Sequence, residues 1–352
     1  MTIRSNVRSC MIAVALTACV PALAGCPKKS DSSSTSDDKK KDDKKKSGDD
    51  DDDDSAAFSR GDVLKHVPKS CGLARAYVDY AGLLADPALK VNADKIDDKI
   101  AQGLKGDQGK KAEQALKILK KAKIDPGKDL REMAVCADGE QDVTLVIGGD
   151  FAGKDVLGAL QKLSEIDDDS TKELKKKDGD GFSYLKGKGK GIIAQLTPNV
   201  FAISDSVDTF ADLVKPNDQS DKFDAGKGRL VVVKGASKKD GVDDGELEIT
   251  NKGDNLELGI TATLSGKALK DIAGTKDPDQ AKTAIKQTLQ QLAKMVDKSP
   301  AADLADDLRD AKVKIDGNTV SVTMKIPNKD LANALQQLVD MNENDLEQIA
   351  NK

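Results

Sequence analysis

The sequence predicts an α+β protein built from two related strand–helix–hairpin–helix units, with mostly antiparallel sheets covered by helices. Three observations lead to this prediction. Residues 129–139 (DLREMAVCADG) recur as residues 307–317 (DLRDAKVKIDG), with six of the eleven positions identical. Apolar and polar residues alternate over 320–326, which is typical of a strand with one solvent-facing side. A stretch with helical periodicity precedes each copy of the repeat.

The similarity between the two halves continues beyond this block. After a small difference in length, residues 154–163 match residues 329–338 through a shared Lys-Asp pair and a shared Ala-Leu-Gln triplet. Two matching blocks in the same order indicate a duplicated unit. We therefore divide the folded part of the chain into a first unit at 57–225 and a second unit at 226–352.

The first unit is expected to start with a strand at 73–80. An amphipathic helix follows, because apolar residues such as Ala112 and Leu116 fall on one face with lysines opposite. The Asp138-Gly139 pair is a tight-turn signal, which predicts a hairpin at this point. The other expected elements of this unit are helices at 154–163 and 206–214 and strands at 182–185, 191–196 and 200–204.

The second unit repeats this order from a strand at 256–264, with a further strand expected before it at 229–233. Its long helix has a clear start, with Asp277 as the cap, Pro278 as the first helical residue and Gln280 at the capping-box position. A hairpin over 311–326 and a helix over 328–340 complete the unit.

The N-terminal residues have the features of an export signal. Arg4 and Arg8 precede an apolar run at 11–20, which is shorter than the about 20 residues needed to span a membrane. The run is followed by Leu23-Ala24-Gly25-Cys26, an aliphatic residue, two small residues and a cysteine. This stretch resembles the lipobox of bacterial lipoproteins. The alternative is an ordinary signal peptide that happens to end beside a cysteine.

The lipobox resemblance has consequences for the mature chain. It implies that residues 1–25 are a signal peptide, and that Cys26 becomes the first residue and carries lipid. It also implies a location in the bacterial cell envelope, where the lipid anchors the chain to the inner or the outer membrane. The folded part would then lie in the periplasm or at the cell surface.

Residues 26–56 are predicted to form a disordered tether that starts with the lipidated cysteine. The segment is rich in serine at 30–36, mixes Asp and Lys at 37–46 and has six consecutive aspartates at 49–54. It offers no large apolar side chain to a core. A flexible coil of this length spans roughly 30 Å. An alternative role for the aspartates is binding of cations or cell wall, but a spacer between membrane and domain accounts for the whole segment.

The cysteines predict one disulfide. The chain has five cysteines, of which two lie in the signal peptide and Cys26 is expected to carry lipid. Cys71 and Cys136 remain, and a pair of cysteines in an exported protein normally forms a disulfide. The alternative is a pair of buried free thiols. A metal site would need further ligands, and the only histidine, His66, is expected at the surface or at the boundary of the domain.

Composition argues against two classes of binding protein. The formal net charge is −5, aromatic residues make up 3% of the chain and tryptophan is absent. A nucleic-acid binder would show a basic face or stacking aromatic residues, and a sugar-binding groove usually needs aromatic platforms. We therefore expect no nucleic acid among the partners.

The sequence contains no recognisable motif for catalysis or cofactor binding. Residues 178–181 (DGDG) fail the calcium-loop template, because Lys176 and Gly187 stand where that template needs acidic residues. The glycine- and lysine-rich residues 187–191 precede an expected strand instead of a helix, so we interpret them as a hairpin connection and not as a phosphate site. We name no catalytic residue, no cofactor and no metal ligand.

These observations predict a membrane-anchored envelope lipoprotein that acts as a non-enzymatic binding or scaffold module. Its partners would be the membrane, through the lipid on Cys26, and an envelope protein. One alternative is a carrier that holds an apolar ligand between the two units. Another alternative is a hydrolase acting through paired carboxylates or a bound metal, which needs acidic residues to converge in a cleft.

The lipid anchor can be tested by replacing Cys26 in protein expressed in a bacterial host. Cys26→Ser is expected to move from the membrane fraction to the soluble fraction, because the acyl chains that together give stable anchoring are no longer attached. Immunoblots of the two fractions measure the change. Cys19→Ser is the matched control, since Cys19 lies in the segment that is removed. Cys26→Ser protein that stays with the membranes would show that the anchor lies elsewhere.

Overall fold

The computed structural model describes residues 57–340, apart from 70, 91–105, 139–142, 167–173, 187–190, 205, 218, 224–225, 227, 238–240, 276, 298 and 300. The signal peptide and the expected tether, including Cys26, lie outside the described residues. Within the described part, the chain forms helices and one large antiparallel sheet, which confirms the predicted α+β class.

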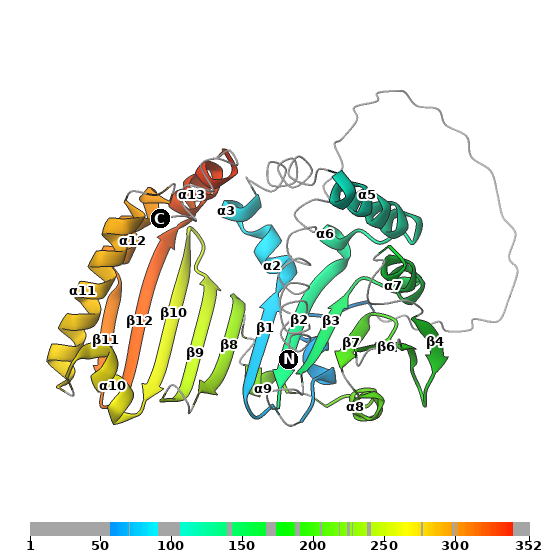
Figure 1. The fold of residues 1–352 in the computed structure, drawn as a ribbon, viewed down its shortest axis with the longest axis horizontal. Coiled ribbons are helices and arrows are strands. Elements are labelled where there is room, and N and C mark those ends of the chain that lie inside the picture. Colours follow the sequence, from blue (N-terminus) through cyan, green and yellow to red (C-terminus); the bar gives the residue numbers. More distant parts are fainter. Residues whose placement is uncertain are drawn as a thin grey trace, which may run out of the picture.

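Twelve strands of the described residues form a single sheet, shown in Figure 1. All neighbouring strands run antiparallel. The order across the sheet is β11-β12-β10-β9-β8-β1-β2-β3-β7-β6-β5-β4. The strands are β1 (Ala74–Asp79), β2 (Leu130–Ala137), β3 (Val143–Gly149), β4 (Lys175–Asp178), β5 (Ser183–Lys186), β6 (Ile192–Thr197), β7 (Val200–Ser204), β8 (Arg229–Ser237), β9 (Val242–Asn251), β10 (Asn255–Leu264), β11 (Lys312–Asp316) and β12 (Thr319–Pro327).

Helices in the described residues are short, apart from two longer ones that each precede a hairpin. These two are α5 (Gly106–Lys121) and α11 (Pro278–Val296), in the places where amphipathic helices were predicted. The others are η1 (Asp62–His66), α2 (Tyr80–Ala85), α3 (Pro87–Lys90), α6 (Pro126–Asp129), α7 (Val156–Ser164), α8 (Val207–Leu213), α9 (Ser220–Phe223), α10 (Gly266–Ala273), η3 (Ala302–Leu304), α12 (Ala305–Arg309) and α13 (Asn328–Asp340).

Two hydrophobic cores lie on opposite faces of the half of the sheet that contains β1 to β7. On one face, side chains of η1, α8 and α9 pack with Tyr77 and Ala134. On the other face, side chains of α7 pack with Met133 and Phe201. Met133 and Ala134 are neighbours in β2 but belong to different cores, because successive side chains of a strand point to opposite faces. This half of the sheet is therefore covered on both sides.

A smaller core lies at the far end of the other half of the sheet. It consists of Leu264 at the end of β10, with Ala268, Leu269, Ala273 and Ala281 from α10 and α11. Figure 1 shows α10, α11 and α12 along the β11–β12 end of the sheet. Helical cover of this half is thus concentrated at one end.

The two predicted units share one continuous sheet, where the sequence suggested separate sheets. β1 pairs with β2 on one side and with β8 on the other, through the pairs Ala76–Val233 and Val78–Val231. Joining the two edges satisfies backbone N–H and C=O groups that separate sheets would leave unpaired. The pairing of β1 with β8 therefore merges the two halves into one body.

The repeated segments share a hairpin strand and the helix after the hairpin, but they differ at their starts. Val135 lies in β2 and the matching Val313 lies in β11, with α7 and α13 following the respective hairpins. Leu130 begins β2, whereas the matching Leu308 lies in α12. β2 is an interior strand and β11 is an edge strand. The duplication therefore remains an interpretation of the sequence.

Both edge strands of the sheet carry lysines. β4 reads KKKD, and all four of its residues are exposed. β11, at the opposite edge, exposes Lys312 and Lys314. β4 was not predicted, because a strand without apolar residues gives no alternating pattern. Its position follows from its pairing with β5.

The start of α11 is as predicted. An oxygen of Asp277 accepts a hydrogen bond from the backbone N–H of Gln280 at 2.9 Å, and Pro278 is the first residue of the helix. The cap satisfies one of the backbone N–H groups that the first turn of a helix leaves free. Because α11 packs against α12 and β11, its stability supports that end of the sheet.

Asp277→Ala is expected to lower the free energy of unfolding by about 1 kcal/mol, because the N–H of Gln280 loses its acceptor. Asp279→Ala is the control, since it removes the same charge from the same turn and leaves the cap in place. Urea unfolding followed by circular dichroism measures both variants. Equal losses for the two would mean that charge near the helix start matters and the cap does not.

Candidate functional site

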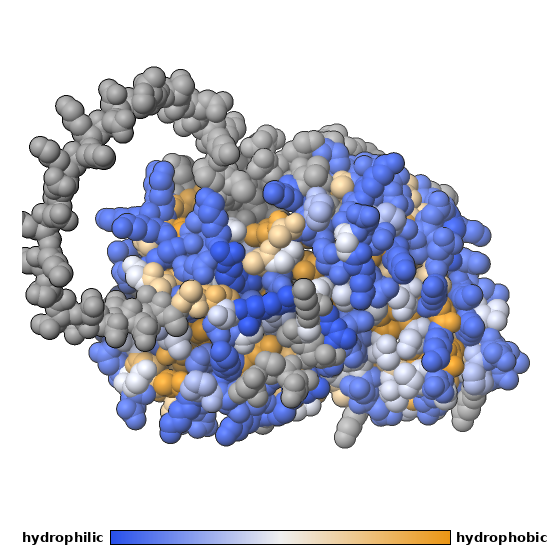
Figure 2. All heavy atoms as spheres, turned by 180° about the vertical axis from the view of Figure 1, so that it is seen from behind, coloured by the Kyte–Doolittle hydropathy of each residue, from blue (hydrophilic) through white to orange (hydrophobic). Residues whose placement is uncertain are grey.

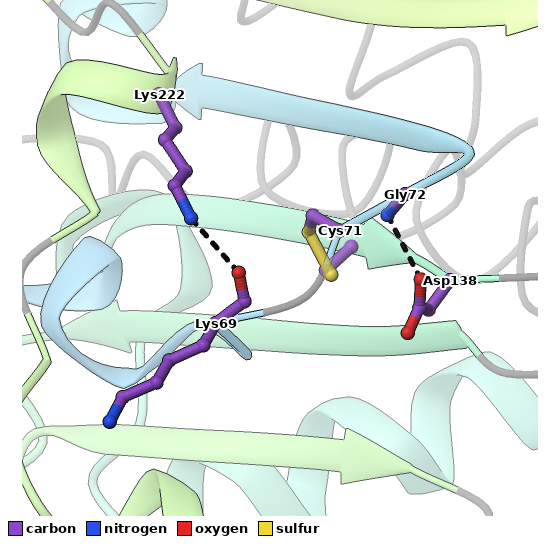
Figure 3. The surroundings of a disulfide bond; sticks show 6 residues. Lys69, Cys71, Gly72, Asp138 and Lys222 are labelled. Carbon is purple, nitrogen blue, oxygen red and sulfur yellow. Dashed lines mark hydrogen bonds between the residues drawn. A yellow bond between two sulfur atoms is a disulfide. The ribbon is translucent and has the colours of Figure 1, made fainter.

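The structure contains the predicted disulfide between Cys71 and Cys136. Their Cα atoms are 5.3 Å apart, within the usual range for a disulfide. Figure 3 shows two hydrogen bonds beside the disulfide. The backbone N–H of Gly72 donates to a carboxylate oxygen of Asp138 at 3.1 Å, and the ammonium of Lys222 donates to the carbonyl of residue 69 at 3.0 Å. Together these bonds hold the segment that leads into β1 against β2 and α9.

A buried carboxylate lies where η1 meets the sheet. Glu132 in β2 is 2% exposed, and its two oxygens accept the backbone N–H of Gly61, each at 2.8 Å. The hydroxyl of Tyr77 donates to the same carboxylate at 2.7 Å. Burial raises the pKa of Glu132 and the pKa of Tyr77, and for Tyr77 the adjacent Glu132 adds to the shift.

The buried Glu132–Tyr77 pair has a structural role. A catalytic acid or base must reach a substrate, whereas Tyr77 is 0% exposed. Arg60, next in the chain to Gly61, forms an ion pair with Asp79 at 3.0 Å, and Asp79 caps α2 through the N–H of Gly82. The network therefore fastens the start of the folded chain to β1, β2 and α2.

A cluster of aspartates lies around α12 and α13. Partial burial and the nearby carboxylates of Asp330, Asp306 and Asp310 raise the pKa of Asp307 to about 6. At the matching position of the first half, Asp129 is instead neutralised by Lys154, with 2.5 Å between the nitrogen and the oxygen. Among the described residues, no group of three or more His, Cys, Asp or Glu side chains is arranged to hold a metal ion. The cluster is thus a place of charge repulsion.

A shallow hollow lies on the β11–β12 hairpin. It has a volume of about 210 Å³ and is lined by Lys314, Asp316, Thr319 and Ser321. Its lining residues are directly opposite each other in the ladder, Lys314 with Ser321 and Asp316 with Thr319. The lining is polar and none of the clustered aspartates around Asp307 contributes to it.

One face of β1, β8, β9, β10 and β12 is apolar across two rows of side chains. Within each row the residues are paired from strand to strand, so that both rows run across the sheet. We call these ten residues the open apolar face. They are Ala76, Val233, Leu247, Ile260 and Val322 in the first row, and Val78, Val231, Ile249, Leu258 and Met324 in the second.

The middle of the open apolar face is exposed to solvent. Val233 is 40% exposed and Ile260 is 42% exposed, whereas Val313, which continues the first row into β11, is 5% exposed. In Figure 1, α10 to α12 lie at the β11–β12 end and α13 lies at the top, and no described helix crosses the middle of β8, β9 and β10. At the other end of the second row, Val78 of β1 packs against the core beneath α7. The described helices therefore cover both ends of the rows and leave the centre on β8, β9 and β10 open.

The opposite face is polar on β9, β10 and β12, whereas Val232 of β8 is buried on that side opposite Tyr77. Lys234 in β8 pairs with Glu246 in β9 at 3.2 Å, and Arg229 pairs with Glu248 at 3.0 Å. Thr261, the neighbour of Ile260, is exposed on this side. The view from behind in Figure 2 is largely hydrophilic over this half of the molecule, with smaller hydrophobic patches. The two faces of β9, β10 and β12 thus differ sharply in chemistry.

Comparisons with known proteins do not identify a family. No family model and no curated protein matches the sequence. Among solved structures, the chain is similar to crystal form III of TP0453, with 9% identity and a TM-score of 0.43, over 81% of this chain and 99% of that chain. It is similar to crystal form I of TP0453 with 9% identity and a TM-score of 0.40, over 81% of this chain and 98% of that chain. A likeness at this level carries no inference about function.

Three features of the site region differ from the sequence analysis or were missed by it. His66 is buried, not at the surface, and its Nδ1 lies 2.7 Å from the carbonyl oxygen of Leu213. The role of Glu132 was missed, although an acidic residue beside the apolar run Met133–Val135 is a signal for a buried partner. The open apolar face was missed because the alternation in β8 and β10 shows which residues share a face, but not whether a helix covers it.

No helix among the described residues combines the length and the apolar character needed to cross a membrane.

The raised pKa of Asp307 predicts a pH-dependent effect of Asp307→Asn. Because the folded-state pKa is about 6 and the ordinary value is 3.8, the stability gained from this proton is full below pH 3.8 and is lost as the pH rises through 6. The variant should therefore be more stable than wild type at pH 7.5 and equal to it near pH 4. Solvent screening of this partly exposed group limits the gain to about 1 kcal/mol or less.

Urea unfolding at both pH values measures the effect of Asp307→Asn. Asp303→Asn is the control, because Asp303 is exposed and does not contribute to the repulsion on Asp307. An effect of Asp307→Asn that is the same at pH 4 and pH 7.5 would contradict the prediction.

Proposed function

We propose that this protein is a membrane-tethered, non-enzymatic binding module of the bacterial cell envelope, and that the open apolar face is its binding surface. The observation that carries the proposal is the exposure of Val233 and Ile260 in the middle of an otherwise apolar sheet face. Contiguous exposed apolar surface is uncommon in soluble domains and marks places where a partner or ligand binds.

The energetics of the open apolar face support binding. Each square ångström of apolar surface removed from water contributes roughly 25 cal/mol, so an apolar ligand that covers Val233 and Ile260 gains affinity directly. The backbone of β8, β9 and β10 is already paired on both sides within the sheet. The ligand therefore meets side chains alone, and the binding is expected to be hydrophobic.

The chemistry of the open apolar face supports a non-enzymatic role. Catalysis needs a nucleophile, an acid or a base placed beside the substrate. All ten side chains of the face are hydrocarbon or thioether groups. The buried Glu132–Tyr77 pair cannot take this role, because its side chains are closed off from solvent. A hydrolase is the alternative proposal, and screening the purified protein against ester and peptide substrates would reveal it.

The place of the open apolar face suggests how the two proposed units work together. The face begins on β1, in the unit at 57–225, and continues on β8 to β12, in the unit at 226–352. We propose that these units arose by duplication and that their junction forms the binding surface. The expected lipid on Cys26 and the tether at 26–56 would hold this surface near the membrane, in the periplasm or at the cell surface.

Ile260→Glu is expected to reduce binding of the apolar dye Nile red about tenfold. Ile260 is already partly exposed, so the glutamate leaves the fold intact, but an apolar ligand would have to cover its charge at a cost above about 1.4 kcal/mol. Fluorescence titration measures the affinity. Thr261→Glu places the same charge on the opposite face of the same strand and should bind the dye as wild type does. Equal affinity for all three proteins would argue against the proposal.

A further inference from the structure

We infer that the open apolar face binds the acyl chains of a phospholipid from the membrane to which the protein is tethered. This inference rests on the proposed function and specifies its ligand. Four properties of the face support an acyl chain: its lack of polar groups, a low row of small residues beside it, its length, and its distance from a membrane.

The chemistry of the open apolar face suits a ligand without polar groups. From Ala76 to Val322, and from Val78 to Met324, neither row contains a hydrogen-bond donor or acceptor in its side chains. An extended peptide placed there would bury backbone N–H and C=O groups without partners, because β8, β9 and β10 have no free edge to offer. A hydrocarbon chain incurs no such cost.

A row of small residues runs beside the first row of the open apolar face. Ala74, Gly235, Gly245 and Ala262 are paired in turn across β1, β8, β9 and β10. A Cβ atom added to Gly235 would lie 3.2 Å from the Cβ of Ala74, so a larger residue would be crowded there. The side chains of this row are small and rise little above the backbone of the sheet, and we call it the low row. The larger side chains of the first row, such as Val233, stand higher above the sheet than the low row. This difference in height forms an edge along which a narrow, linear chain can lie.

The length of the open apolar face matches an acyl chain. Neighbouring strands are about 4.8 Å apart, so the three steps from β8 to β12 span about 14 Å. Half of a bilayer's hydrocarbon core, which is the depth of one leaflet's acyl chains, is about 15 Å. Because the rows run across the strands, a chain lying along them contacts β8, β9, β10 and β12.

The expected tether brings the open apolar face close to a supply of phospholipid. The tether expected at residues 27–56 would span roughly 30 Å as a coil, and Cys26 is expected to hold one end at the membrane surface. A face within this distance of the headgroups meets phospholipid at high local concentration. The same tether keeps the module at one membrane, so the phospholipid of that membrane is the ligand we assign.

Transfer of a fluorescent phospholipid tests the inference. The chain from residue 26 onward with Cys26→Ser, which removes the protein's own lipid and the apolar run at 11–20, is mixed with vesicles. The vesicles consist of phosphatidylethanolamine and phosphatidylglycerol and contain self-quenching amounts of a pyrene-acyl phospholipid. Protein that takes up the probe relieves the quenching. We expect Val233→Glu and Ile260→Glu, each made in this background, to reduce the uptake about tenfold, and Thr261→Glu to leave it unchanged.

The outcomes separate the lipid inference from the proposed function. Failure of the Cys26→Ser protein to relieve quenching, with Nile red binding that still depends on Ile260, would overturn the lipid inference and leave the proposed function standing. A dimer in sedimentation experiments that Ile260→Glu converts to a monomer would also overturn it, because a second copy would then occupy the face. Absence of both lipid uptake and Nile red binding would contradict both the lipid inference and the proposed function.

Discussion

The pairing of β1 with β8 is the constraint on which the rest of the structure depends. Through Ala76–Val233 and Val78–Val231, it joins the strands before position 205 to those after 228 in one ladder. On the side of β1, both faces of the sheet are covered and Tyr77 is fully buried. On the side of β8, the described helices α10, α11 and α12 lie at the far end of the sheet. The difference in cover between the two halves leaves Val233 exposed next to the junction.

Local patterns predicted most of the elements but not how they assemble. The cap at Asp277 and the alternation in β12 are signals within a few residues, and both were confirmed. β9 was missed because Asp243, Asp244 and Gly245 interrupt the alternation that Leu247 and Ile249 carry. Its neighbours β8 and β10 supply the pairing that makes it a strand. Pairing between distant segments of the chain cannot be predicted from a short window of sequence.

The candidate site depended even more on long-range packing. The cysteine count predicted the Cys71–Cys136 bond, because an even pair in an exported chain has few other uses. No such signal indicated the exposure of Ile260, since an apolar residue in an alternating strand is normally predicted to lie in the core. Only the positions of α10 to α13 decide that Val313 is covered and Ile260 is not. Glu132 is similar, because its partner Gly61 lies 71 residues away in the chain.

The lysines of the two edge strands have a consequence for how the protein behaves at high local density. A protein that displays an apolar sheet face risks stacking into filaments when many copies share a small area. Growth of a filament through the strands would require a new chain to pair with β4 or β11, and it would have to approach the charges of Lys175–Lys177 or of Lys312 and Lys314. The lysines at both edges of the sheet therefore disfavour growth by strand pairing, although the centre of the apolar face is exposed.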